Sequence, residues 1–336
     1  MLDHGTSILP ASRPVAETEL DGLAGAPWSE PAHPERILRV GLLNNMPDAA
    51  LMQTERQFRR LIGPGVELRL FSLDTVPRGP LARAHLDRFY ASHEALAGAG
   101  LDALVVTGAE PKARHLADEP FFAALAAVVD WAEAQGIPTL FSCFAAHAAV
   151  LHLDGIERRP LPAKYSGVYA CRVVAEHPLL AGMPASMPVP HSRWNDLPEA
   201  ALAARGYRIL RRSDAVGVDL FVRDGAGGAP MVFLQGHPEY DADTLAREYR
   251  RDVGRFLEGE RETCPSLPEN YYTDESVACL EAFAAMARAD RAPALHADFP
   301  TIAETPARPA GWPEGAAGLF RNWLALVSAR TAALAA

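Results

Sequence analysis

Short apolar runs alternate along this chain with stretches of helical periodicity, and this alternation constrains the fold more than any other feature. Apolar runs at 38–43, 66–71, 101–106 and 137–141 predict buried strands, and helical patterns follow the first and third of them. Repeated strand–helix units run their strands in parallel and cover both faces of a sheet. The sequence therefore predicts an α/β fold, a doubly wound and mostly parallel sheet with helices on both faces.

The second half of the chain follows a different pattern, in which short strand candidates are separated by turns rich in proline and glycine. Strands at 169–174, 207–210 and 219–222 predict some antiparallel pairing before an apolar run at 231–234 returns to the main sheet. Along the whole chain we expect three segments, namely a flexible leader at 1–35, a main domain at 36–257 and a C-terminal extension with a closing helix at 258–336.

Composition and charge exclude several classes of function. The 336 residues include 42 acidic and 32 basic side chains, a formal net charge of −10, without a dense cluster of lysine or arginine, so nucleic-acid binding is not expected. No apolar run approaches the length that spans a membrane, and we expect a cytoplasmic protein. The four cysteines, at 143, 171, 264 and 279, form no CxxC pair, so neither a metal site nor a disulfide framework is expected.

Cys143 stands at the most informative position for function. The apolar run at 137–141 changes after Ser142 and Cys143 into the small-residue stretch 144–150, a pattern typical of a strand, a sharp turn and a helix. At such a corner the sulfur lies at the carboxyl edge of the sheet, where helix N–H groups stabilise a thiolate and bind anions. A cysteine with apolar neighbours is more often an inert core residue, but this position favours a nucleophile.

A second strand end supplies a candidate base. The run at 231–234 leads into Gln-Gly-His237-Pro-Glu239, which places a histidine after a strand and a carboxylate two residues later. Loops at the carboxyl ends of parallel strands converge on one crevice. Cys143, His237 and Glu239 are therefore the predicted catalytic residues, as nucleophile, base and orienting carboxylate. His147, one helical turn after Cys143, is a less favoured alternative base.

Seven motifs occur in order along the chain: Leu43-Asn-Asn-Met-Pro47, Thr54-Glu-Arg-Gln-Phe58, Val106-Thr-Gly-Ala109, Ser166-Gly-Val-Tyr169, Pro190-His-Ser-Arg193, Gly236-His-Pro-Glu-Tyr-Asp241 and Asn322-Trp323. As an ordered set they resemble the homoserine O-acyltransferases of methionine biosynthesis, a family of O-succinyltransferases and O-acetyltransferases. The resemblance runs from about Leu38 to the C-terminus. It implies a class I glutamine-amidotransferase-like fold, which is flavodoxin-like.

The resemblance implies an acyl transfer in two steps. Cys143 takes the acyl group of acyl-CoA, the co-substrate, as a thioester, and the hydroxyl of L-homoserine then accepts it. A thiolate suits the first step because it attacks thioesters readily. His237 would remove the proton of the acceptor hydroxyl, and Glu239 would orient the imidazole. Backbone N–H groups of Phe144 and of the loop Gly108–Ala109 are the expected oxyanion hole.

Three more residues match family positions in the substrate pocket. Lys164 and Ser192 match a lysine and a serine of the acceptor pocket, and Arg251 matches the arginine that pairs with the carboxylate of the amino acid. A guanidinium binds a carboxylate through two parallel hydrogen bonds, which suits that task. Without the resemblance these would be a surface lysine, a turn serine and a solvated arginine. The resemblance implies no bound cofactor, and it suggests a homodimer.

Two departures from the family pattern concern the substrates. Asp48 and Ala49 follow Pro47, where the family usually carries two lysines. The loop after Ala109 continues with Glu110, Pro111 and Lys112, and Lys112 aligns with a position that separates succinyl users from acetyl users. A lysine there would attract the succinyl carboxylate, and the nearby Glu110 would oppose it. Succinyl-CoA is therefore slightly favoured as the donor, and acetyl-CoA stays open.

Three rival functions stay open. A glutamine amidotransferase-like hydrolase shares the fold and the Cys-His-Glu set, but its nucleophile turn usually reads Gly-x-Cys-x-Gly, and the residues around Cys143 lack both glycines. A binding or redox-sensing protein could keep the scaffold without the reaction. A third rival keeps the chemistry and uses serine or another hydroxy amino acid as the acceptor.

Overall fold

The computed structural model describes residues 37–301 and 311–335, which fall within one compact unit that begins at Ile37. The strands β1 to β10 span, in chain order, Leu38–Leu43, Val66–Ser72, Ala91–Ser92, Ala103–Val106, Thr139–Ser142, Arg159–Val173, Ser186–Asp196, Arg208–Ser213, Gly217–Asp224 and Pro230–Leu234. The helices α1 to α8 span Asp48–Ile62, Pro80–Phe89, Phe122–Ala134, Phe144–Asp154, Glu199–Ala204, Thr244–Leu257, Asp274–Ala289 and Trp312–Ala335. None of these helices is long and apolar enough to cross a membrane. The predicted leader at 1–35 lies outside the described residues.

The ten strands join one sheet in the order β3-β2-β1-β4-β5-β10-β9-β8-β6-β7. Neighbouring strands from β3 to β10 run parallel, and those from β10 to β7 run antiparallel. This architecture confirms the predicted α/β fold with a doubly wound, mostly parallel sheet. It also confirms that antiparallel strands precede the return of β10 to the parallel half.

Helices cover both faces of the parallel strands because these strands are apolar on both sides. On β1, Leu42 packs in one cluster with Phe58 of α1 and Trp323 of α8. The next residue, Leu43, packs in a different cluster with Val129 of α3 and with residues of α4. Successive side chains of a strand point to opposite faces. Helices α1 and α8 therefore cover one face of the sheet, and α3 and α4 cover the other.

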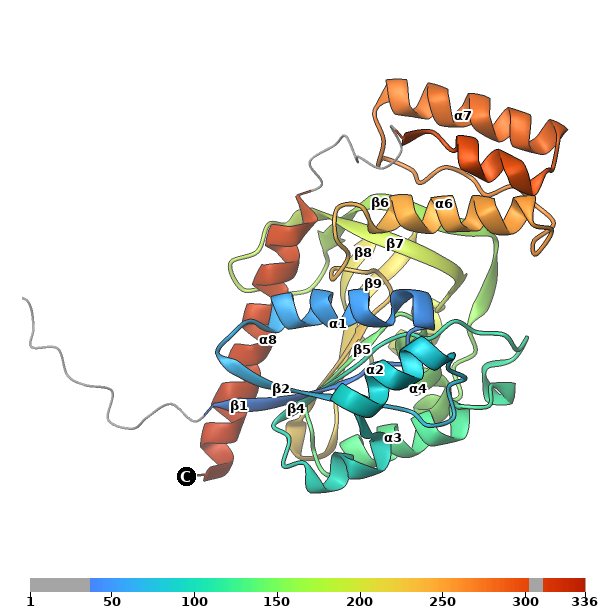
Figure 1. The fold of residues 1–336 in the computed structure, drawn as a ribbon. Helices are drawn as coiled ribbons and strands as arrows, with labels where there is room; N and C mark the ends of the chain where they lie inside the picture. Colours follow the sequence, from blue (N-terminus) through green and yellow to red (C-terminus); the bar gives the residue numbers. More distant parts are fainter. Residues whose placement is uncertain (1–36, 302–310, 336) are drawn as a thin grey trace, which may run out of the picture. The chain divides into compact units, whose positions relative to one another are not determined.

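Helix α6 carries the apolar stripe that its sequence predicts. Leu245, Tyr249, Val253 and Phe256 are buried and pack in a third cluster with Phe283 of α7. Helix α7 therefore lies on the outer side of α6, as Figure 1 shows. The division of the chain into 36–257 and 258–336 stays a prediction.

The sequence did not predict strand β7, which contains Pro188 and Pro190. Proline cannot donate a ladder hydrogen bond, so it is confined mostly to edge strands. Among the described strands β7 is the last in the sheet order and pairs with β6 alone. The edge position explains how two prolines are tolerated in a strand of 11 residues.

The packing of α8 generates a stability prediction. Trp323 is fully buried beneath the sheet, whereas Leu334 on the same helix is 74% exposed. We expect Trp323→Ala to lower the free energy of unfolding by about 3–5 kcal/mol, because a large cavity replaces the indole. Leu334→Ala is the matched control and should change it by less than about 0.5 kcal/mol. Urea unfolding measures both, and equal effects would contradict the placement of α8.

Candidate active site

Cys143 occupies a strained corner between β5 and α4. Its backbone angles are φ 49° and ψ −111°, a region that non-glycine residues rarely adopt and that costs about 1–3 kcal/mol. The Cys143 N–H donates to the carbonyl of Leu234 at 2.7 Å, and the Cys143 carbonyl accepts from the N–H of Ala146 at 2.9 Å. These hydrogen bonds join the corner to the end of β10 and to the first turn of α4. The side chain stays partly exposed, as a nucleophile requires.

The Cys143 side chain lines a cavity of about 490 Å³, which we call the Cys143 cavity. Gly108, Ala109 and Phe144 line the same cavity. Phe144 is the first residue of α4, so its N–H has no partner within the helix. A Cβ added to Gly108 would lie 3.5 Å from the Phe144 nitrogen, which shows how closely the two backbones approach. The expected oxyanion donors are thus brought together beside the sulfur.

His237 lies three residues after the end of β10 and lines the Cys143 cavity. Its N–H donates to the carbonyl of Pro190 at 2.8 Å, and its Nδ1 lies 2.8 Å from Oε1 of Glu239. The imidazole stacks on the Tyr240 ring, with the ring centroids 4.3 Å apart. His237 and Glu239 are both buried. With Nδ1 bound by the carboxylate, Nε2 is the ring nitrogen left for the sulfur and the substrates.

The charges around His237 favour its protonated form. Burial alone lowers the pKa of an imidazole, but the charges of Cys143 and Glu239 and their hydrogen bonds to the ring outweigh burial. Together they raise the pKa of His237 well above its ordinary value. The sulfur of Cys143 lines the same cavity as this ring, the arrangement that a nucleophile and its base require.

His147 lies outside this arrangement. It is buried, and its Nε2 lies 2.9 Å from Oε1 of Gln235. Burial, with the nearby charges of Arg193 and Arg158, lowers the pKa of His147 to about 3, despite the hydrogen bond to Gln235. His147 is not among the residues that line the Cys143 cavity. The geometry therefore favours a packed, neutral histidine over the alternative base.

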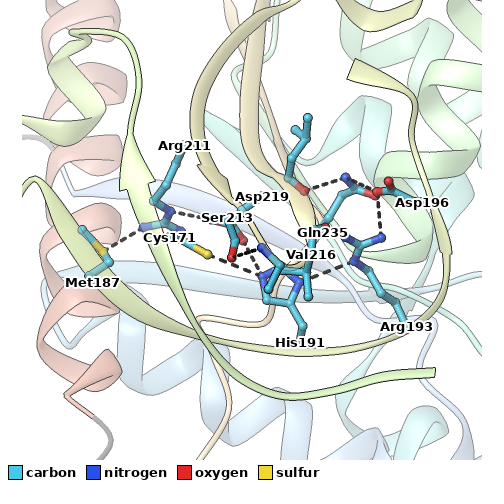
Figure 2. Close-up of polar contacts among 12 residues, drawn as sticks. Cys171, Met187, His191, Arg193, Asp196, Arg211, Ser213, Val216, Asp219 and Gln235 are labelled. Carbon is cyan, nitrogen blue, oxygen red and sulfur yellow. Dashed lines mark hydrogen bonds and ion pairs between the residues drawn. The ribbon is translucent and has the colours of Figure 1, made fainter. Parts of the chain in front are cut away.

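A buried polar network holds the turn that carries His237, and Figure 2 shows its members. The Gln235 N–H donates to the carbonyl of Asp219, and the Gln235 side chain donates to the carbonyl of Val218. A Cβ added to Gly236 would lie 2.4 Å from Oδ1 of Asp219 and 3.0 Å from Nε2 of His191. Only glycine fits at position 236, because the buried Asp219 and His191 pack directly against its backbone.

The same network contains three side chains of metal-binding types. One ligand atom from each of Cys171, His191 and Asp219 lies within 4.8 Å of the other two. The guanidinium of Arg211, however, donates its Nε–H to Asp219 at 2.5 Å. Burial and the charge of Asp219 raise the pKa of the Cys171 thiol, which favours the protonated sulfur. The donor set therefore suits an internal ion pair better than a cation site.

Lys164, Ser192 and Arg251 also line the Cys143 cavity. Lys164 Nζ lies 3.0 Å from Oδ2 of Asp252, and Ser192 Oγ donates to Oε2 of Glu248. Arg251 donates from Nε and Nη2 to Oδ1 of Asp252, at 3.1 and 2.9 Å. The structure thus brings the three predicted substrate residues into one charged cluster with two carboxylates of α6.

Both carboxylates of this cluster are held in the charged form. Burial favours the neutral acid, but the charges of Lys164 and Arg251 lower the pKa of Glu248, and Ser192 and Tyr240 add hydrogen bonds. The same two cations lower the pKa of Asp252 against its burial. Tyr240 donates to Oε1 of Glu248 at 2.7 Å while its ring stacks on the imidazole of His237. Tyr240 therefore connects the candidate base with the charged cluster.

Sequence reasoning did not find several residues of the Cys143 cavity. These residues are Trp194, Tyr240, Glu248, Asp252, Arg255 and Arg261. Tyr240 stands in the same motif as His237, and Glu248 and Asp252 stand close to Arg251 on one helix. Their closeness in sequence to predicted site residues is the signal that could have identified them. Lys112, in contrast, is exposed and lines an adjoining cavity of about 230 Å³, but not the Cys143 cavity itself. Its predicted role in donor choice stays a prediction.

Known proteins match both the sequence and the fold. The family model described as homoserine O-succinyltransferase matches residues 29–333. A homoserine O-succinyltransferase of Methylorubrum extorquens is 79% identical over 332 residues, which cover 99% of each chain. This chain belongs to the homoserine O-succinyltransferase family. A relative of the same name from Rhodopseudomonas palustris is 50% identical over 294 residues, 86% of this chain and 88% of the relative.

The fold of this homoserine O-succinyltransferase family member is similar to a solved glutamine amidotransferase from Thermotoga maritima. The TM-score is 0.51 at 15% identity, over 88% of this chain and 99% of the other. At such low identity the similarity shows the fold alone. The predicted class I glutamine-amidotransferase-like fold is therefore confirmed.

The charges at the site generate a prediction about titration. The sulfur of Cys143 raises the pKa of His237, so Cys143→Ala should lower it. Glu239→Gln should lower it too, because the second negative charge is lost. Histidine ring resonances followed by NMR across pH measure the change. In the same spectra His147, with its pKa of about 3, serves as the control and should not titrate above about pH 5. An unchanged pKa of His237 in Cys143→Ala would contradict the proposed contact.

Proposed function

We propose that this chain transfers the succinyl group of succinyl-CoA to the hydroxyl of L-homoserine, with Cys143 as the carrier. Membership of the homoserine O-succinyltransferase family supports the donor and the acceptor. One structural observation supports the mechanism: the strained Cys143 and the buried His237, which Glu239 holds at 2.8 Å, line the same cavity. No bound cofactor takes part in this scheme, since succinyl-CoA enters as a co-substrate.

The first step forms a thioester on the enzyme. The Cys143 sulfur attacks the carbonyl carbon of succinyl-CoA, and negative charge develops on the carbonyl oxygen. The N–H groups of Phe144 and Ala109 would stabilise this oxyanion from fixed backbone positions. When the tetrahedral intermediate collapses, the bond to the CoA sulfur breaks, and protonated His237 supplies the proton to the departing thiolate.

The second step transfers the group to homoserine. Once Cys143 is acylated, its contribution to the raised pKa of His237 is lost. The neutral imidazole then accepts the proton of the homoserine hydroxyl as the oxygen attacks the thioester. Glu239 stabilises the resulting imidazolium. Collapse of the second intermediate releases O-succinylhomoserine and regenerates the sulfur.

The charged cluster suits the acceptor. Homoserine carries an ammonium and a carboxylate, and the cluster offers both carboxylates and cations beside the base. Arg251 would bind the substrate carboxylate, and Glu248 with Asp252 would bind the ammonium, which supports the carried-over family roles. Lys164 and Ser192 hold these acids in place through the contacts described above.

Two rival functions fit the same fold less well. A glutamine amidotransferase-like hydrolase usually carries a glycine on each side of its nucleophile turn, and the residues around Cys143 lack both. A redox-sensing protein would need no paired acids and bases beside the cysteine. Serine, shorter than homoserine by one methylene, is the closest competing acceptor. The cytoplasmic location and the homodimer expected from the sequence stay predictions.

Mass spectrometry tests the carrier directly. After mixing with succinyl-CoA in the absence of acceptor, the intact chain should gain one succinyl group, and peptide mapping should place it on Cys143. Cys143→Ala should gain none and should lose steady-state transfer, because the sulfur that forms the thioester is removed. Cys279, which is exposed, provides the matched control variant, since Cys279→Ala should still be acylated. An adduct on Cys279 alone would contradict the assignment.

Arg251→Ala tests the acceptor side. The KM for homoserine should rise about 10- to 100-fold, because a charge-assisted hydrogen-bond pair is lost, while the KM for succinyl-CoA should change little. Steady-state kinetics with each substrate varied in turn measures both constants. A homoserine KM that does not change would remove Arg251 from the acceptor pocket.

A further inference from the structure

The cations of the Cys143 cavity fall into two groups. Lys164, Arg251 and Arg261 all lie within 4 Å of carboxylate oxygens of Asp252, at 3.0, 2.9 and 3.6 Å. These three cations therefore surround the acids of the acceptor side. Arg255 also lines the cavity, one helical turn after Arg251 on α6, but its partner lies elsewhere.

Arg255 pairs with the loop that carries the oxyanion donors. Its Nη1 donates to Oε1 of Glu110 at 2.7 Å, and its Nε lies 3.9 Å from Oε2 of Glu260. Glu110 follows Gly108 and Ala109, which line the cavity beside Cys143. Arg255 therefore contacts the loop that carries the expected oxyanion donors, whereas the other three cations contact Asp252.

We propose that Arg255 binds the terminal carboxylate of the succinyl group and so selects succinyl over uncharged acyl donors. This inference rests on the proposed function, since it names the residue that recognises the acyl group of the donor at the same site. A succinyl group attached to Cys143 extends by two methylene groups to a carboxylate. A guanidinium recognises that carboxylate through two parallel hydrogen bonds.

The ion pair between Arg255 and Glu110 can give way to a pair between Arg255 and the succinyl carboxylate. The side chains of Arg255 and Glu110 are 36% and 38% exposed, and an ion pair so open to water contributes little to stability. The incoming carboxylate can therefore replace Glu110 at small cost. In the absence of donor, Glu110 keeps the guanidinium directed toward the loop.

Lys112 is the competing candidate from the sequence. It lies on the same loop but lines an adjoining cavity of about 230 Å³, which shares Ala109 and Glu110 with the Cys143 cavity. Arg255, in contrast, shares its cavity with Cys143, His237 and the oxyanion donors. A carboxylate on the thioester-bound group would meet Arg255 without leaving the Cys143 cavity.

Acylation of Cys143 without homoserine provides the test, because it separates the donor site from the acceptor site. Rapid-quench mass spectrometry gives the second-order rate constant for succinyl-CoA and for butyryl-CoA, which has the same chain length without the carboxylate. Arg255→Met keeps much of the apolar stem and removes the charge. We expect it to lower the succinyl rate constant about 10- to 100-fold and the butyryl rate constant by less than about twofold. Arg255→Lys should restore part of the preference.

Matched variants separate the outcomes. Arg247→Met removes an exposed arginine of α6 that pairs with Asp243, and it should leave both rate constants unchanged. An equal loss for succinyl-CoA and butyryl-CoA in Arg255→Met would overturn the inference, since the residue would only shape the cavity. A selective loss in Lys112→Met with none in Arg255→Met would overturn it as well. If the wild-type chain forms no succinyl adduct at all, the proposed function fails, whereas an adduct that is insensitive to Arg255 defeats only this inference.

Discussion

The hydrogen bond from the Cys143 N–H to the carbonyl of Leu234 is the interaction on which the rest of the site depends. It joins the ends of β5 and β10, two strands far apart in sequence and adjacent in the parallel sheet. Because of this contact the cysteine keeps its strained backbone, and the sulfur lies beside the turn that begins at Gln235. Strain of this kind persists only when the surrounding structure determines it from several sides.

The buried network behind Gly236 performs the same task for the base. Asp219 and His191 leave no room for a side chain at Gly236, and Pro190 accepts the N–H of His237. One strand, β7, thus supplies a contact for the base and, through Ser192, a contact for the acids of the acceptor side. The relative positions of nucleophile, base and acceptor cluster are therefore set by backbone contacts at one edge of the sheet.

The sequence alone predicted the parts of this molecule that follow from periodicity and from strand ends. Strands β1, β2 and β10 and the apolar stripe of α6 agree with their expected ranges. Burial of a strand or of one helix face requires apolar residues at regular spacing, and this spacing can be recognised in the sequence. Strand β7 was missed because Pro188 and Pro190 argue against a strand unless its edge position is known. Lys112 could not be placed because sequence alignment gives a position in a loop and not the cavity that the side chain faces. The roles of Glu248, Asp252 and Arg255 depend on which side of α6 meets β6 and β7, which only the packed structure reveals.

The central claim is that the acyl group passes through Cys143 before it reaches homoserine. The most direct measurement is a chase of the isolated succinyl-enzyme, freed of all succinyl-CoA, with homoserine in a quench-flow instrument. The account predicts that the mass adduct disappears and O-succinylhomoserine appears together, at a rate no slower than steady-state turnover. Loss of the adduct to free succinate, or transfer slower than turnover, would show that the thioester lies off the reaction path and would contradict the account.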